Sequence, residues 1–69
     1  MKWILKRYMI DQHIESFNQL ADMTGIARRT LFDRINAPRT LRVYEVAALD
    51  KVLHFSEDDL LRLARGDIE

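Results

Sequence analysis

Apolar and polar positions recur with the period of an α-helix along the whole chain. Near the start, Ile4, Leu5, Tyr8 and Met9 lie three or four residues apart, which predicts a helix over residues 2–12 with one apolar stripe. The other segments with this period are residues 16–24, 28–36, 41–53 and 56–65. No segment shows the strict alternation of a β-strand. The pattern therefore predicts an all-α, compact five-helix domain that occupies residues 1–69 as a single unit.

The second and third of these segments are expected to form two short helices joined by a tight turn. Ser16 is a favoured N-cap, and Gln19 three residues later completes a capping-box pattern. Gly25 stands where the first helix must end, because a residue without a Cβ adopts the left-handed conformation at least cost. Leu31 and Ile35 share one face of the second helix. This arrangement predicts a helix-turn-helix.

Boundary signals also frame the last two helices. Pro38 ends the third helix, since proline cannot continue one, and Thr40 is expected to cap the fourth. Ser56 is expected to cap the fifth, and residues 57–59 place three acids in its first turn, where the helix dipole favours negative charge. Gly66 is a natural terminator of this last helix.

The charges are unevenly distributed, although the formal net charge is zero. Residues 28–42 hold five arginines against one aspartate, a net charge of +4, and residues 43–69 carry −4. A net charge of zero argues against a nucleic-acid binder, but a local basic segment is the more informative signal. The basic segment coincides with the second helix of the predicted helix-turn-helix.

Several classes of chemistry are not expected. The chain has no cysteine, so it has neither disulfides nor thiolates, and its two histidines, His13 and His54, lie far apart without a cluster of ligands. We find no nucleophile paired with a base and no glycine-rich phosphate loop. We therefore expect no enzyme activity, metal, cofactor or small-molecule substrate. No apolar run is long enough to span a membrane and no signal peptide is present, which favours a cytoplasmic, nucleoid-associated protein.

The arginines of the basic segment are suited to contacts with DNA. An arginine can donate two hydrogen bonds to guanine O6 and N7, and the first turn of a recognition helix usually enters the major groove. Arg28 and Arg29 lie in that turn. Asp33 lies one turn further, where it either accepts from a cytosine amino group or orients Arg29. We expect these three residues to contact bases.

A second set of residues is expected to contact the DNA backbone. Phosphate contacts depend on charge more than on exact geometry, and the N-terminus of a helix attracts a phosphate. The residues in this set are Phe17, Asn18, Thr30, Arg34, Arg39 and Arg42. An alternative is that the arginines form only a solvated surface that pairs with the acidic C-terminal segment.

A family resemblance strengthens the DNA-binding interpretation. It rests on Leu20-Ala21, Gly25-Ile26, the run from Ala27 to Pro38, Thr40-Leu41 and the apolar positions up to Leu53. In these features, residues 16–53 resemble the lambda-repressor/Cro-type helix-turn-helix proteins, known as the XRE family. The aromatic residue after Leu31 is similar to that of small phage and prophage regulators.

The resemblance implies a sequence-specific transcriptional regulator of Cro/CI-like type, a repressor that binds operator DNA as a homodimer. Its third helix would lie in the major groove, with Arg28, Arg29 and Asp33 facing bases. The family usually has alanine at Asp50 and glycine at His54, so we expect a locally altered fourth helix and turn.

The surface that would form the homodimer is less defined. The candidates are Trp3 and, from the last helix, Leu60, Leu61, Leu63 and Ile68. Two other functions are left open by the sequence. One is a protein-interaction module, such as an antitoxin or anti-repressor. The other is an architectural or recombination-directionality protein that binds DNA with weak sequence preference.

Overall fold

The computed structural model describes residues 1–65, and these residues form five α-helices and no strand. The helices are α1 (Lys2–Asp11), α2 (Phe17–Thr24), α3 (Arg28–Asn36), α4 (Val43–Leu53) and α5 (Glu57–Arg65), with a short 3-10 turn, η1 (Pro38–Thr40), between α3 and α4. The prediction of a compact all-α domain with five helices is confirmed. The expected role of Gly66 as a helix terminator lies outside the described residues.

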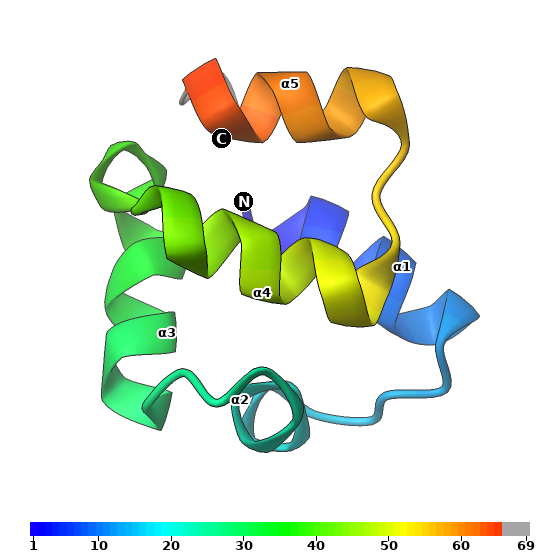
Figure 1. The fold of residues 1–69 in the computed structure, drawn as a ribbon. Coiled ribbons are helices and arrows are strands. Elements are labelled where there is room, and N and C mark those ends of the chain that lie inside the picture. Colours follow the sequence, from blue (N-terminus) through cyan, green and yellow to red (C-terminus); the bar gives the residue numbers. More distant parts are fainter. Residues whose placement is uncertain (66–69) are drawn as a thin grey trace.

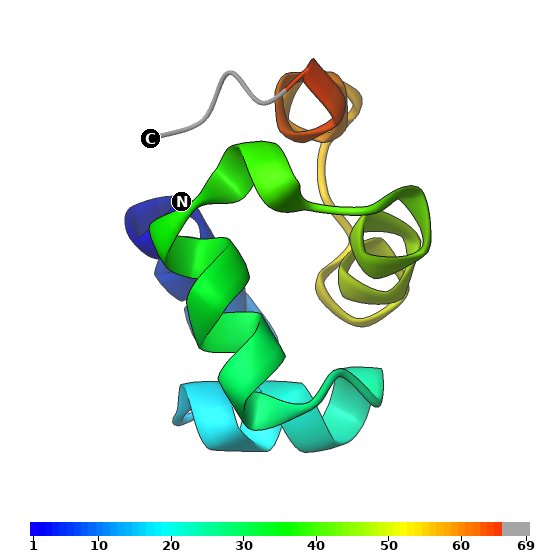
Figure 2. The ribbon, with the colours of Figure 1, turned by 90° about the vertical axis from the view of Figure 1, so that its left-hand side faces the viewer.

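Helix α4 lies at the centre of the arrangement and packs against α1, α2 and α5. In Figure 1, α5 runs above α4, α2 is seen end-on below it, and α3 stands at the left. The view turned by 90° shows α3 in front, with α2 across its lower end (Figure 2). Helix α3 is therefore at the edge of the domain and has one side open to solvent.

The core contains side chains from every helix. Leu5, Leu20, Leu31, Leu49 and Leu53 are completely buried. Burial of each such side chain contributes about 1.5–3 kcal/mol before the loss of conformational entropy is counted. The other buried apolar residues are Met1, Met9, Ile14, Ala21, Ile26, Ile35, Phe55 and Leu63. The helical apolar stripes seen in the sequence therefore meet in one core.

Helix α2 begins and ends as predicted. The backbone N–H of Gln19 donates to Ser16 Oγ at 3.1 Å, and the Gln19 side chain accepts from the N–H of Glu15 at 3.0 Å. Gly25 ends the helix in the left-handed conformation, with φ of 77°. The short connection to α3 is closed further by Thr24, whose Oγ1 accepts from the N–H of Ile26.

The start of α4 differs from the prediction. Thr40 does not cap the helix, because its hydroxyl donates to the carbonyl oxygen of Ala37 at 2.6 Å and closes the 3-10 turn η1. The helix begins two residues later than expected, at Val43, with Arg42 as the N-cap residue. The backbone N–H of Arg42 donates to Oε1 of Glu45 at 2.8 Å, which satisfies this end of the helix by the reciprocal bond of a capping box.

At its other end, α4 stops at a residue with positive φ. His54 adopts the left-handed conformation with φ of 56°, and its N–H donates to the carbonyl oxygen of Asp50 at 2.7 Å. The Asp50 carboxylate then accepts from the N–H of Phe55 at 3.1 Å. Asp50 and His54 therefore form the turn together, since the aspartate accepts from the backbone N–H that follows the residue with positive φ.

A polar network joins α1 to the start of α5. The hydroxyl of Tyr8 donates to the carboxylate of Asp59 and accepts from the N–H of Ser56 at 3.0 Å. Arg7 pairs with the same carboxylate at 2.9 Å. The hydrogen bond from Tyr8, followed by those from Ser56 and the charges of Arg7 and Arg62, lowers the pKa of Asp59 below its ordinary value of 3.8, although burial opposes the shift. Asp59 therefore links two helices in addition to lying at a helix start.

None of the helices in residues 1–65 is both long and apolar enough to cross a membrane.

Candidate nucleic-acid interface

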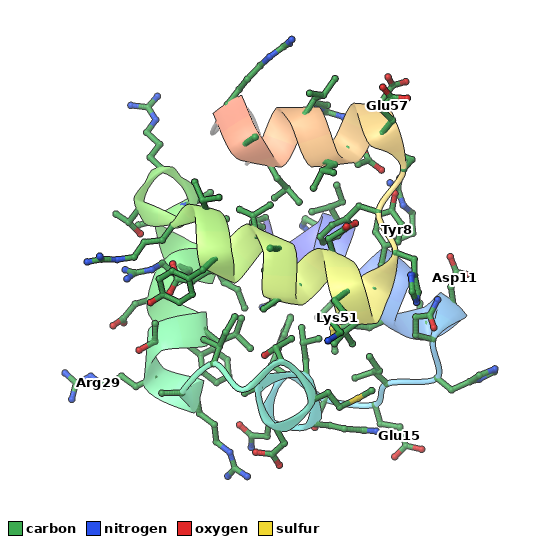
Figure 3. All side chains as sticks on the ribbon, viewed as in Figure 1. Tyr8, Asp11, Glu15, Arg29, Lys51 and Glu57 are labelled. Carbon is green, nitrogen blue, oxygen red and sulfur yellow. The ribbon has the colours of Figure 1, made fainter. Side chains whose placement is uncertain are left out.

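Helix α3 has a buried side and an outward side. Leu31 and Ile35 point into the core, whereas Arg29, Asp33 and Asn36 are exposed. Positions 29, 33 and 36 follow the spacing of one helix face. Figure 3 shows Arg29 extending away from the domain at the lower end of α3. The outward side of α3 therefore presents a guanidinium and a carboxylate one turn apart.

Arg28 points toward α2 and pairs with Asp22. Its Nη2 lies 3.4 Å from Oδ1 and 3.3 Å from Oδ2 of that aspartate, and both side chains are exposed. A surface ion pair of this kind is worth about 0–1 kcal/mol. The pair therefore orients Arg28 at the entrance to α3 but leaves it accessible to another anion.

Arg34 lies on a different side of α3 and faces α4. Its Nε donates to Oε1 of Glu45 at 2.9 Å, and its side chain is only 20% exposed, against 1% for Glu45. Its Nη1 also lies 3.4 Å from Thr40 Oγ1. We expected a phosphate contact from Arg34, but the structure places its guanidinium in a mostly buried ion pair between two helices.

Arg39 and Arg42 lie beyond α3, in η1 and at the N-cap of α4, and both are exposed. Neither forms an ion pair with another residue of the part of the chain described. The same holds for Arg29. Three of the five arginines of the basic segment are thus left without a carboxylate partner among residues 1–65. Thr30, in contrast, is half-buried.

The start of α2 lies next to α3. The ring of Phe17 packs edge-on against the ring of Phe32, with the centroids 5.8 Å apart and the planes at 70°. We expected Phe17 to contact the DNA backbone, and the structure shows its side chain packed against Phe32. Asn18 is exposed. Because Ser16 already accepts from the N–H of Gln19, only the N–H groups of Phe17 and Asn18 at this end can donate to an anion.

The arginines of the basic segment do not pair with α5. Asp59, the buried acid of α5, contacts Arg7 and Arg62, and no ion pair within residues 1–65 joins α5 to residues 28–42. Figure 3 shows Glu57 and Arg29 on opposite sides of the domain. Within the described residues, the basic segment therefore pairs with the acidic C-terminal segment only through Arg34 and Glu45 of α4, and α5 takes no part in it.

The candidate dimer residues have different environments. Trp3 is 75% exposed and Leu61 is 47% exposed, whereas Leu60 is half-buried and Leu63 is buried in the core. Leu63 was therefore the wrong choice for a surface contact. Ile68 lies outside the described residues. Between α4 and α5 lies an apolar groove of about 280 Å³, lined by Leu41, Val43, Val46, Ala47, Asp50, Leu60, Leu63 and Ala64.

Residues 1–65 contain no group of three or more acidic or histidine side chains that are placed to hold a metal ion.

Three residues of this region were missed by the sequence interpretation. Glu45 is charged but completely buried, and the available signal was its position three residues after Arg42, typical of a capping carboxylate. Phe32 and Asn36 are exposed on α3, and a helical projection from Arg29 would have placed both near its outward side.

Comparison of the chain with models of known protein families, with curated proteins and with solved structures gives no match.

Proposed function

We propose that the protein is a sequence-specific, double-stranded DNA-binding transcriptional regulator, a repressor of the Cro/CI-like phage or prophage type. The observation that carries the proposal is the outward side of α3, where Arg29 has no ion-pair partner within residues 1–65 and Asp33 lies one turn away. An exposed arginine on the second of two helices joined by a short turn is typical of helix-turn-helix proteins. No cofactor or membrane enters this function.

In this proposal α3 is the recognition helix. Its nine residues span about 13 Å at 1.5 Å per residue, and the major groove, about 12 Å wide, admits an α-helix. Arg29 would donate to guanine O6 and N7. Asp33 would accept from a cytosine amino group or hold Arg29 in place, and Arg28 would contact a base after exchanging its weak partner Asp22.

The DNA backbone would be held by the exposed charges around α3. Arg39 and Arg42 follow the C-terminal end of α3, and the N-terminus of α2 with Asn18 lies next to α3 through the contact of Phe17 with Phe32. Each neutralised phosphate contributes about 0.9 to the slope of log K against log salt concentration, so two arginines account for about 1.8 per monomer. Arg34 has a different role in this proposal, because its ion pair with Glu45 fixes α3 against α4.

The proposal includes a homodimer on DNA. Two copies of α3 would enter successive major grooves, with half-sites about 34 Å apart, one helical turn of DNA. An operator that overlaps a promoter would then be closed to RNA polymerase by steric exclusion.

Selection of bound sequences from a random duplex pool at about 150 mM salt tests the proposal, because non-specific binding is weak under those conditions. We expect recovery of an inverted repeat whose half-sites are one helical turn apart. Recovery of no motif would contradict the proposal. Weak preference combined with strong bending of the DNA would instead indicate the architectural or recombination-directionality function.

A second candidate function is a protein-interaction module such as an antitoxin or anti-repressor. The apolar groove between α4 and α5 favours it, since Val43, one of the residues that line the groove, is exposed. This candidate predicts DNA affinity that stays non-specific. The same selection experiment therefore separates the two functions.

A further inference from the structure

Phe32 is the one large apolar side chain that α3 leaves exposed. Its side chain is 43% exposed, whereas the neighbouring outward positions carry the polar residues Arg29, Asp33 and Asn36. A phenylalanine among polar residues on a helix surface keeps apolar area in contact with water, which costs free energy in the isolated domain. A partner that covers the ring would recover it.

The ring of Phe32 is supported from one side. Phe17 meets it edge-on at a centroid distance of 5.8 Å, and Phe17 in turn is half-buried and packs against the core. An edge-to-face pair prefers a defined geometry. The contact therefore restrains the ring and leaves its remaining surface directed away from α2.

Phe32 lies beside the residues of α3 that we propose for base contacts. It lies three residues after Arg29 and next to Asp33, and residues three apart on a helix have their Cβ atoms about 5–6 Å from each other. Successive base pairs of DNA are about 3.4 Å apart. If Arg29 contacts a guanine, the ring of Phe32 falls one or two base pairs away.

In the major groove, one base carries an apolar group at its edge. This group is the C5-methyl of thymine, and phenylalanine is among the residues that contact it. We propose that Phe32 is a specificity-determining residue that recognises a thymine C5-methyl group in each half-site. The proposal rests on the proposed DNA-binding function and adds to it a base preference that no charged residue supplies.

Deoxyuridine substitution tests the proposal, because uracil lacks only the C5-methyl group. The probes are the tightest-binding duplex recovered by the selection and versions of it with one thymine at a time replaced by deoxyuridine. For the wild-type protein we expect about a fourfold rise in Kd at one thymine of each half-site, the value for one buried methyl group. Phe32→Ala and Phe32→Gln should each bind the thymine duplex and its deoxyuridine version with equal Kd.

Two variants are used so that the test does not depend on one of them folding. Both introduce good helix formers at an exposed position, and circular dichroism identifies the variant that keeps the wild-type helix content. Ile10→Ala, which removes an exposed apolar side chain from α1, is the matched control and should keep the wild-type ratio of Kd values.

The possible outcomes distinguish a failure of this inference from a failure of the proposed DNA-binding function. Sequence-specific binding that is equally tight for thymine and uracil at every position overturns the role of Phe32 alone. The same conclusion follows if the folded Phe32 variants retain the wild-type dependence on the methyl group. Failure of the selection to recover any motif overturns the DNA-binding function and this inference together.

Discussion

Helix α3 carries two arginines whose environments are opposite. Arg34 is mostly buried and bonded to Glu45, whereas Arg29, five residues earlier, is exposed and has no carboxylate partner within residues 1–65. The difference follows from helical geometry, because five residues turn a side chain by about 140° around the axis. One arginine therefore fixes the helix to the domain, and the other remains available to a ligand.

The largest expected effect tests this comparison directly. Arg34→Ala should lower the free energy of unfolding by about 3–5 kcal/mol, because it leaves the Glu45 carboxylate buried without its partner. Arg29→Ala should change the free energy of unfolding by less than about 0.5 kcal/mol. Urea denaturation followed by circular dichroism measures both. Equal losses of unfolding free energy in the two variants would show that Arg34 does not stabilise the fold more than Arg29 does.

The polar network between α1 and α5 provides the next test. Asp59→Asn should cost about 1.5–3 kcal/mol at pH 7, because the network loses hydrogen bonds to a charged acceptor. The pKa of Asp59 is lower in the folded state, so its stabilising contribution is complete above its ordinary value of 3.8 and is lost as the pH falls through the folded value.

The acid side of the stability curve gives the control for that variant. Urea midpoints recorded from pH 7 down to pH 2 should fall less steeply for Asp59→Asn than for the wild type. A parallel displacement of the two curves would contradict the role of the lowered pKa. Asp58→Asn, which changes an exposed neighbour, should follow the wild-type curve.

The exposed arginines should differ in their effect on DNA binding. Arg29→Ala is expected to relax the preference at one base position by about 1–3 kcal/mol, whereas Arg39→Ala should weaken binding to all sequences and lower the salt slope by about 0.9. Titrations of the selected duplex and its single-base variants at several salt concentrations measure both effects. Sequence-independent losses from Arg29→Ala would exclude base recognition by the outward side of α3.

The smallest expected effects concern the turns that border the two regions. His54→Gly should raise the free energy of unfolding by about 1 kcal/mol, because glycine adopts the left-handed conformation without the penalty of a Cβ. This corresponds to a rise in Tm of about 4–8 °C. Gly25→Ala should have the opposite sign and a similar size, since its new Cβ would meet no atom within 4 Å and only the φ of 77° opposes it. If a thermal melt shows the wild-type Tm for either variant, the left-handed conformation of that residue does not affect stability as we expect.

Local signals in the sequence predicted most of the helices correctly. The caps at Ser16 and Gln19 and the turn at Gly25 depend on residues close in sequence, and the structure confirms them. The predicted start of α4 was wrong because the sequence offers two capping side chains, those of Thr40 and Glu45. Thr40 bonds backward into the 3-10 turn, and Glu45 supplies the cap instead.

The partners of charged side chains could not be predicted in the same way. The pairing of Arg34 with Glu45 depends on how α3 crosses α4, and that of Tyr8 with Asp59 joins residues 51 apart. The spacing of arginines identified the basic segment but not which of these arginines would form ion pairs within the fold. Arg29, Arg39 and Arg42 are predicted DNA contacts that still await measurement.

The bonds from Tyr8 and Arg7 to Asp59 also affect how the chain folds as it is made. The ribosome synthesises α1 long before α5, so the first helix leaves the exit tunnel without its distant partner. Contacts between residues so far apart form late, because the intervening chain must first be brought together. During synthesis the bonds between α1 and α5 therefore form only after α5 has emerged, whereas α1 can pack against α4 before that.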